Sequence, residues 1–119
     1  MKTYFELITE MSKSDLQELE SRLTVLMEHS LKIGHVTGRV AHDNVRGRNH
    51  TVRNQRRDLA AHIRANPGLK SKLTGQMLDK VYRVALAKVK TEFRTTPFPL
   101  SRQLSLDEIV GPELVATLK

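Results

Sequence analysis

The sequence predicts an all-α protein, a small bundle of three to four helices followed by an extended segment that contains prolines and by a short last helix. Apolar residues recur every three or four positions over long stretches, which is the spacing of one helix face. No stretch of useful length alternates apolar and polar residues as a half-buried strand does. The 119 residues have the length of one typical domain, so we expect residues 1–119 to form a single helical domain.

The first part of the chain predicts a short helix at Thr3–Met11 and a long helix from Ser14 to about Gly34. Ser14 is followed by Gln17 at the spacing of a capping box, which favours a helix start at Ser14. The face of the long helix that should enter the core carries a stripe at steps of three and four, namely Leu16, Leu19, Leu23, Leu26, Ser30 and Ile33.

A polar, glycine-bracketed stretch at 34–49 predicts a loop before the next helix, which we expect from Asn49 to Ala65. Pro67 should end that helix, because proline lacks the backbone N–H that a helix interior requires. A loop of this length without its own structure is uncommon in a compact domain. We therefore interpret the stretch at 34–49 as functional or mobile.

A further helix is predicted from Leu69 to Phe93, with Gly75 weakening its first turns slightly. The prolines of the 96–99 stretch then require extended backbone. One short amphipathic helix is expected at Leu104–Val110, with Ser105 as its cap.

The charge of the chain gathers in its middle. The formal net charge is +7. Residues 33–102 hold fifteen Lys and Arg against four Asp and Glu, whereas residues 1–32 and residues 103–119 each have a negative net charge. An excess of this kind is typical of proteins with a polyanionic or acidic partner. We therefore consider RNA, DNA or an acidic protein as partners.

Composition also bounds the function. The chain has no cysteine, which excludes disulfides, a thiolate nucleophile and Cys-ligated metal centres. No run of eighteen apolar residues predicts a membrane span, and the start shows no secretory signal. We expect a cytoplasmic protein without a cofactor.

Arginines on the predicted second helix form the strongest candidate binding site. At 100° per residue, four of them fall within about 40° of one another if the helix begins at or before Arg46, namely Arg46, Arg53, Arg57 and Arg64. Guanidinium groups along one helix side suit phosphate contacts, although a solvated helix face has the same pattern. With two arginines of the preceding loop, the candidate set is Arg39, Arg46, Arg48, Arg53, Arg57 and Arg64.

The side chain of Arg56 projects from the predicted helix beside Val52, away from the other arginines, and should lie at the edge of the core. A half-buried guanidinium needs an acidic or carbonyl partner. We expect Glu20 or Glu28 of the preceding helix to be that partner.

Two catalytic alternatives rest on short patterns. Arg57 and His62 resemble the Arg-x4-His motif of the HEPN ribonucleases, in which Arg steadies the scissile phosphate and His is the general base. Arg22 and His29 have a similar spacing. The order of His35, His42-Asp43 and Asp79 distantly resembles metal-dependent phosphohydrolases of the His-Asp type, but His42-Asp43 falls in the expected loop. We expect no metal site and no enzyme, with the ribonuclease kept as the alternative.

Three segments together carry a family resemblance: Leu19–Lys32, Thr51–Arg57 with the following Asn66–Leu69, and Leu106–Val110 with the preceding Phe98-Pro99. In order and spacing they are similar to the bacterial all-helical family catalogued as domain of unknown function 29. An aromatic-rich N-terminal segment and a Trp typical of that family are missing here. The resemblance implies an all-helical fold and transfers no catalytic residue.

A homodimer through an exposed apolar residue such as Leu31 or Val45 is a further expectation.

Overall fold

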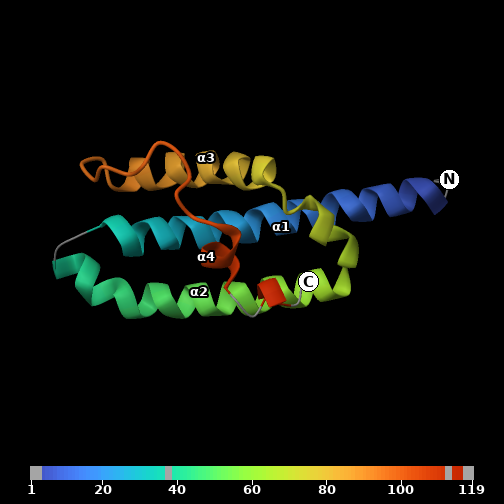
Figure 1. Cartoon of the computed structure of the whole chain (residues 1–119), viewed down its shortest axis with the longest axis horizontal. Helices are drawn as coiled ribbons and strands as arrows, with labels where there is room; N and C mark the ends of the chain where they lie inside the picture. The colour runs from blue at the N-terminus through green and yellow to red at the C-terminus, as the bar shows by residue number, and fades with distance from the viewer. Residues whose placement is uncertain (1–3, 37–38, 112–113, 117–119) are drawn as a thin grey trace.

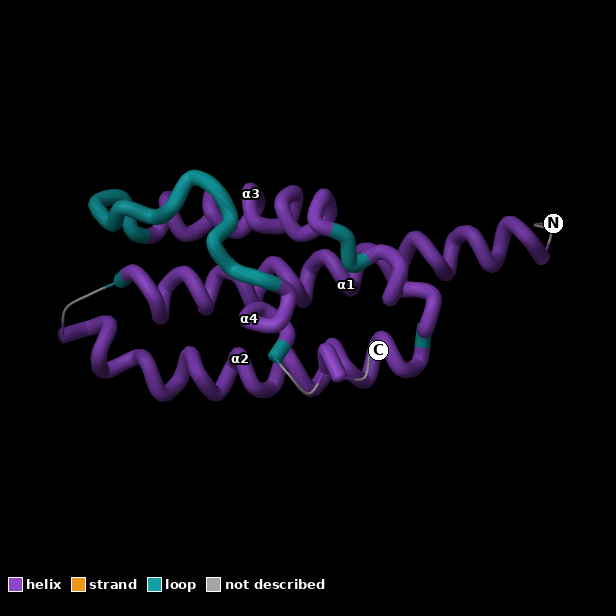
Figure 2. Tube along the Cα trace, viewed as in Figure 1, coloured by secondary structure: helices purple, strands orange, loops and turns teal. Residues whose placement is uncertain are grey.

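A computed structural model describes the backbone of residues 4–36, 39–111 and 114–116, and the side chains of residues 13–36, 46–111 and 114–116. The elements are α1 (Tyr4–His35), α2 (Arg39–Ala65), the 3₁₀ helix η1 (Pro67–Lys72), α3 (Gly75–Glu92) and α4 (Leu106–Val110). Helices and connecting loops make up the described backbone, which contains no strand (Figure 2). The predicted all-α fold is confirmed.

Helix α1 lies in the middle of the bundle. Helices α2 and α3 pack along its two sides, and the segment after α3 returns across α1, where α4 lies (Figure 1). The molecule is therefore built around one central helix, and the outer sides of α2 and α3 form two opposite edges.

The core follows the apolar periodicity of the sequence. In α1 the predicted stripe is buried at Leu19, Leu23 and Leu26, whereas Leu16 and Ile33 pack at its margin. Leu31, expected as an exposed residue of a homodimer, is only 2% exposed and belongs to this core. The other helices contribute the buried residues Val52, Leu59, Ile63, Leu78, Val81, Tyr82, Ala85, Leu86, Val89, Ile109 and Val110.

The first two helices are longer than the sequence predicts. Helix α1 runs without a break through Ser14, so the separate helix at Thr3–Met11 and the capping box at Ser14 are wrong. Residues 12–15 contain no Gly or Pro, and a serine is tolerated inside a helix although it favours a cap. Helix α2 already begins at Arg39, so the predicted loop at 34–49 is also wrong. Gly47 lies inside α2, since one glycine costs a helix only about 1 kcal/mol.

The start of α3 differs as well. A 3₁₀ helix at Pro67–Lys72 takes the place of the first predicted turns, and α3 begins after Thr74. The hydroxyl of Thr74 accepts a hydrogen bond from the N–H of Met77 at 3.2 Å, which satisfies one free donor of the first turn. The cap at Ser105 is confirmed, with a full capping box that includes Glu108. Across the described residues, no helix has the length and hydropathy to span a membrane.

Candidate functional site

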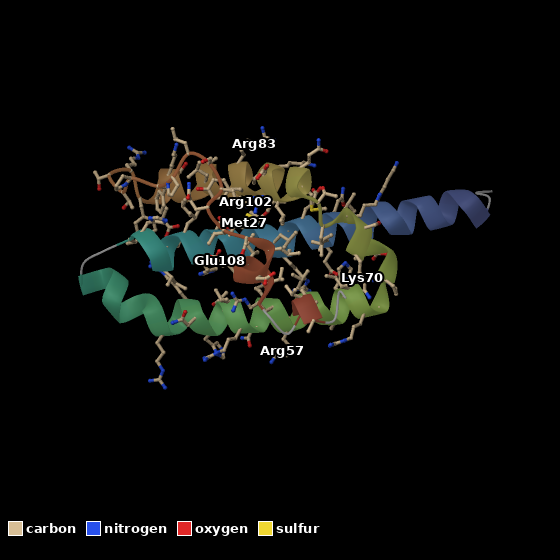
Figure 3. All side chains as sticks on the ribbon, viewed as in Figure 1. Met27, Arg57, Lys70, Arg83, Arg102 and Glu108 are labelled. Carbon is tan, nitrogen blue, oxygen red and sulfur yellow. The ribbon has the colours of Figure 1, made fainter. Side chains whose placement is uncertain are left out.

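The exposed arginines of α2 form the candidate site. We call Arg46, Arg53, Arg57 and Arg64 the arginine stripe; all four side chains are exposed. Val52 and Leu59, which lie about 120° and 140° from the centre of the stripe around the helix, are buried. The burial of the apolar side against α1 therefore turns the stripe toward solvent, and Figure 3 shows Arg57 projecting from the outer side of α2.

The stripe forms few ion pairs with the side chains that the structure describes. Arg57 is 72% exposed and lies 3.7 Å from the carboxylate of Asp58 through Nε, a contact that water screens strongly. Among the described side chains, the other three arginines of the stripe have no ion-pair partner. From Arg46 to Arg64 the stripe is about 27 Å long, at 1.5 Å per helical residue.

Two further arginines of the predicted set are placed differently. The side chain of Arg39 lies outside the described residues. Arg48 is half-buried, and its guanidinium carbon lies 5.7 Å from the centre of the Phe93 ring. Its Nη1 atom is buried without a hydrogen-bond partner in the described part of the chain. Arg48 therefore belongs to the interior of the bundle rather than to the arginine stripe.

Arg56 holds the C-terminal segment against α2. Its Nε donates to the carbonyl of Ile109 at 3.1 Å, and its Nη2 donates to the carbonyl of Glu108 at 2.6 Å. The expected ion pair with Glu20 or Glu28 is not formed, and Glu20 pairs with Lys80 at 3.1 Å instead. Carbonyls at a helix C-terminus lack partners within the helix, so the end of α4 offers the guanidinium strong acceptors.

The close packing of Arg56 depends on Gly111, which follows α4. Gly111 has a φ of +87° and a ψ of 154°, a conformation essentially restricted to glycine. A Cβ at this position would lie 3.3 Å from Cδ of Arg56. The glycine thus allows the chain to turn directly beside the Arg56 side chain.

The structure does not bring Arg57 and His62 together. The His62 side chain is 9% exposed, with Nδ1 2.5 Å from a carboxylate oxygen of Glu18 and Nε2 3.0 Å from the carbonyl of Asp15. Arg57 points into solvent about 140° away around α2. Both ring nitrogens of His62 are engaged, so neither is available to a substrate.

The residues of the second catalytic pattern are also dispersed. Asp79 pairs with Arg102 at 2.7 Å, and His35 meets the ring of Phe98 edge-on at 6.0 Å. The side chains of His42 and Asp43 lie outside the described residues. In the part of the chain with described side chains, no three His, Asp or Glu residues are arranged to hold a metal ion.

Sequence reasoning missed a mixed cluster where α1, α2 and the end of α3 meet. Lys32 donates to the carboxylate of Glu92 at 2.7 Å, and its Nζ lies 5.8 Å from the centre of the Phe93 ring. Burial, together with the positive charges of Lys32 and Arg48, lowers the pKa of His29, while Glu92 acts in the opposite direction. Helical spacing signals only the pair His29 and Lys32; the other members come from distant parts of the chain.

Comparison with known proteins identifies one family. The model of the family described as "Domain of unknown function DUF29" matches residues 1–115, which is nearly the whole chain. No curated protein and no solved structure matches the sequence. The family suspected from the three sequence segments is thus confirmed, and the chain belongs to the DUF29 family.

Proposed function

We propose that this protein is a nucleic-acid-binding module that contacts the phosphate backbone through the arginine stripe. The observation that carries the proposal is the exposure of four guanidinium groups along one side of α2, three of them without an ion pair to any side chain that the structure describes. Guanidinium groups donate paired hydrogen bonds to phosphate oxygens and remain charged at any physiological pH. We expect this binding to take place in the cytoplasm.

The chemistry around the stripe favours nucleic acid over an acidic protein. Protein interfaces are usually centred on apolar or aromatic anchors. The large apolar side chains that the described surface exposes are Val84 of α3 and Leu100, and neither belongs to α2. The aromatic side chains Tyr82 and Phe98 are buried, so they offer no platform on which single-stranded bases could stack. Duplex RNA or DNA, recognised by its phosphate backbone and its shape, is therefore the ligand that best suits the arginine stripe.

The proposal is tested by fluorescence anisotropy with duplex RNA and duplex DNA of about twenty base pairs at low salt. Removing Arg53 and Arg57 together, by Arg53→Ala and Arg57→Ala, should weaken binding at least about tenfold, because two phosphate contacts are lost. The matched control is Arg83→Ala with Lys90→Ala, which removes the same charge from exposed positions of α3. Equal weakening by both double variants would show a nonspecific effect of net charge, and unchanged binding by the α2 variant would refute the proposal.

A further inference from the structure

The cluster around His29 joins three helices through few hydrogen bonds. His29 and Lys32 come from α1, Arg48 from α2, and Glu92 and Phe93 from the end of α3. Lys32 and Arg48 both approach the Phe93 ring, at 5.8 and 5.7 Å from its centre. A cation near an aromatic face is attracted by the ring, and the attraction strengthens when the cation is shielded from water. The Lys32 side chain is only 15% exposed, so water screens its contacts with Glu92 and with the Phe93 ring only weakly.

Two buried polar atoms of the cluster have no hydrogen-bond partner among the described residues. Nδ1 of His29 and Nη1 of Arg48 are both buried and make no hydrogen bond to the described residues. The charged groups that act on the His29 ring are Lys32 from its own helix, Arg48 from α2 and Glu92 from α3. Glu92 already pairs with Lys32, so no second carboxylate of the cluster is left for a charged imidazole.

Protonating His29 would therefore place a third cation among Lys32, Arg48 and a single carboxylate. We infer that His29, Lys32, Arg48, Glu92 and Phe93 form a pH-sensitive latch, which holds the first half of α2 against α1 and α3 while the His29 ring is neutral. This latch does not rest on nucleic-acid binding, because it concerns the packing of α2 and not its outer side.

The direction of the effect follows from proton linkage. The pKa of His29 lies below its ordinary value of 6.5 in the folded chain, so the unfolded chain binds more protons in the window below pH 6.5. The contribution of the latch to stability is fully present above that pH and is lost as the pH falls through the window. At mildly acidic pH, the first half of α2 should open before the second half, which is held by Arg56 and by the buried Ile63.

The test measures thermal unfolding of the full chain by circular dichroism at about pH 7.5 and about pH 5. The variants are His29→Gln, Arg48→Met, which removes the charge but keeps an apolar stem, and the control His50→Gln at an exposed position of α2. Between the two pH values, the wild type and His50→Gln should lose at least about 4 °C more in Tm than His29→Gln. Arg48→Met should fall between them, because burial and Lys32 still lower the pKa of His29 in that variant.

Hydrogen exchange on the wild-type chain provides a readout that does not depend on a variant's folding. After correction for the intrinsic rate, amides of residues 46–53 should exchange several-fold faster at about pH 5, whereas residues 57–64 should change little. An equal acid loss of Tm in the wild type and in folded His29→Gln would overturn the latch. So would uniform acceleration of exchange along α2.

Discussion

Arginines on the two sides of α2 have different roles. On the inner side, Arg56 donates two hydrogen bonds to backbone carbonyls near the C-terminus of α4, and Arg48 lies over the ring of Phe93. On the outer side, the arginine stripe is exposed and makes no hydrogen bond to the described residues. The difference teaches that the angle of an arginine around its helix decides whether it stabilises the fold or remains available to a ligand.

The largest effect should come from removing the inner arginine. Arg56→Ala deletes two charge-assisted hydrogen bonds and leaves two carbonyls at the end of α4 without their partner, so we expect the free energy of unfolding to fall by about 2–4 kcal/mol. Urea denaturation followed by circular dichroism measures this loss. The control Arg64→Ala, from the outer side, should change stability by no more than about 0.5 kcal/mol. Equal losses for the two variants would remove the distinction between the sides.

A smaller loss is expected at the turn beside Arg56. Gly111→Ala forces a residue with a Cβ into a backbone conformation of φ +87° and brings that Cβ to 3.3 Å from the Arg56 side chain. The expected cost is about 1–3 kcal/mol. Gly68→Ala is the matched control, because no atom lies within 4 Å of the Cβ that it would add. If both alanine variants unfold at the same temperature, the close approach of Arg56 to Gly111 has no energetic weight.

The smallest effect on stability belongs to the stripe itself. The double variant Arg53→Ala with Arg57→Ala should keep its free energy of unfolding within about 0.5 kcal/mol of the wild type, because exposed side chains contribute little to folding and the contact of Arg57 with Asp58 is screened by water. Urea denaturation followed by circular dichroism measures this difference as well. A fall of more than about 1 kcal/mol in the free energy of unfolding would assign these arginines a structural role and weaken their interpretation as a binding surface.

Sequence periodicity was sufficient for features that depend on one helix alone. The buried stripe of α1 and the outward direction of the arginine stripe both follow from the angle of 100° per residue. The start of α1 could not be predicted, because capping residues such as Ser14 permit a helix end without requiring one.

Contacts between elements that lie far apart in the chain could not be predicted from the sequence. Arg56 and its acceptors at Glu108 and Ile109 lie more than fifty residues apart, and only the packed position of α4 brings them together. The cluster at His29 likewise needs α1, α2 and the end of α3 to meet. Periodicity gives each side chain its direction around a helix, but it does not give the partner found there.

The salt dependence of duplex binding tests the central claim most directly. Each phosphate neutralised on a duplex contributes about 0.9 to the slope of log affinity against log salt concentration. If the arginine stripe contacts phosphates, the wild-type slope should be about −3 to −4, and Arg53→Ala with Arg57→Ala should reduce its magnitude by about 2. An unchanged slope in that double variant, or a wild-type slope near zero, would contradict the account.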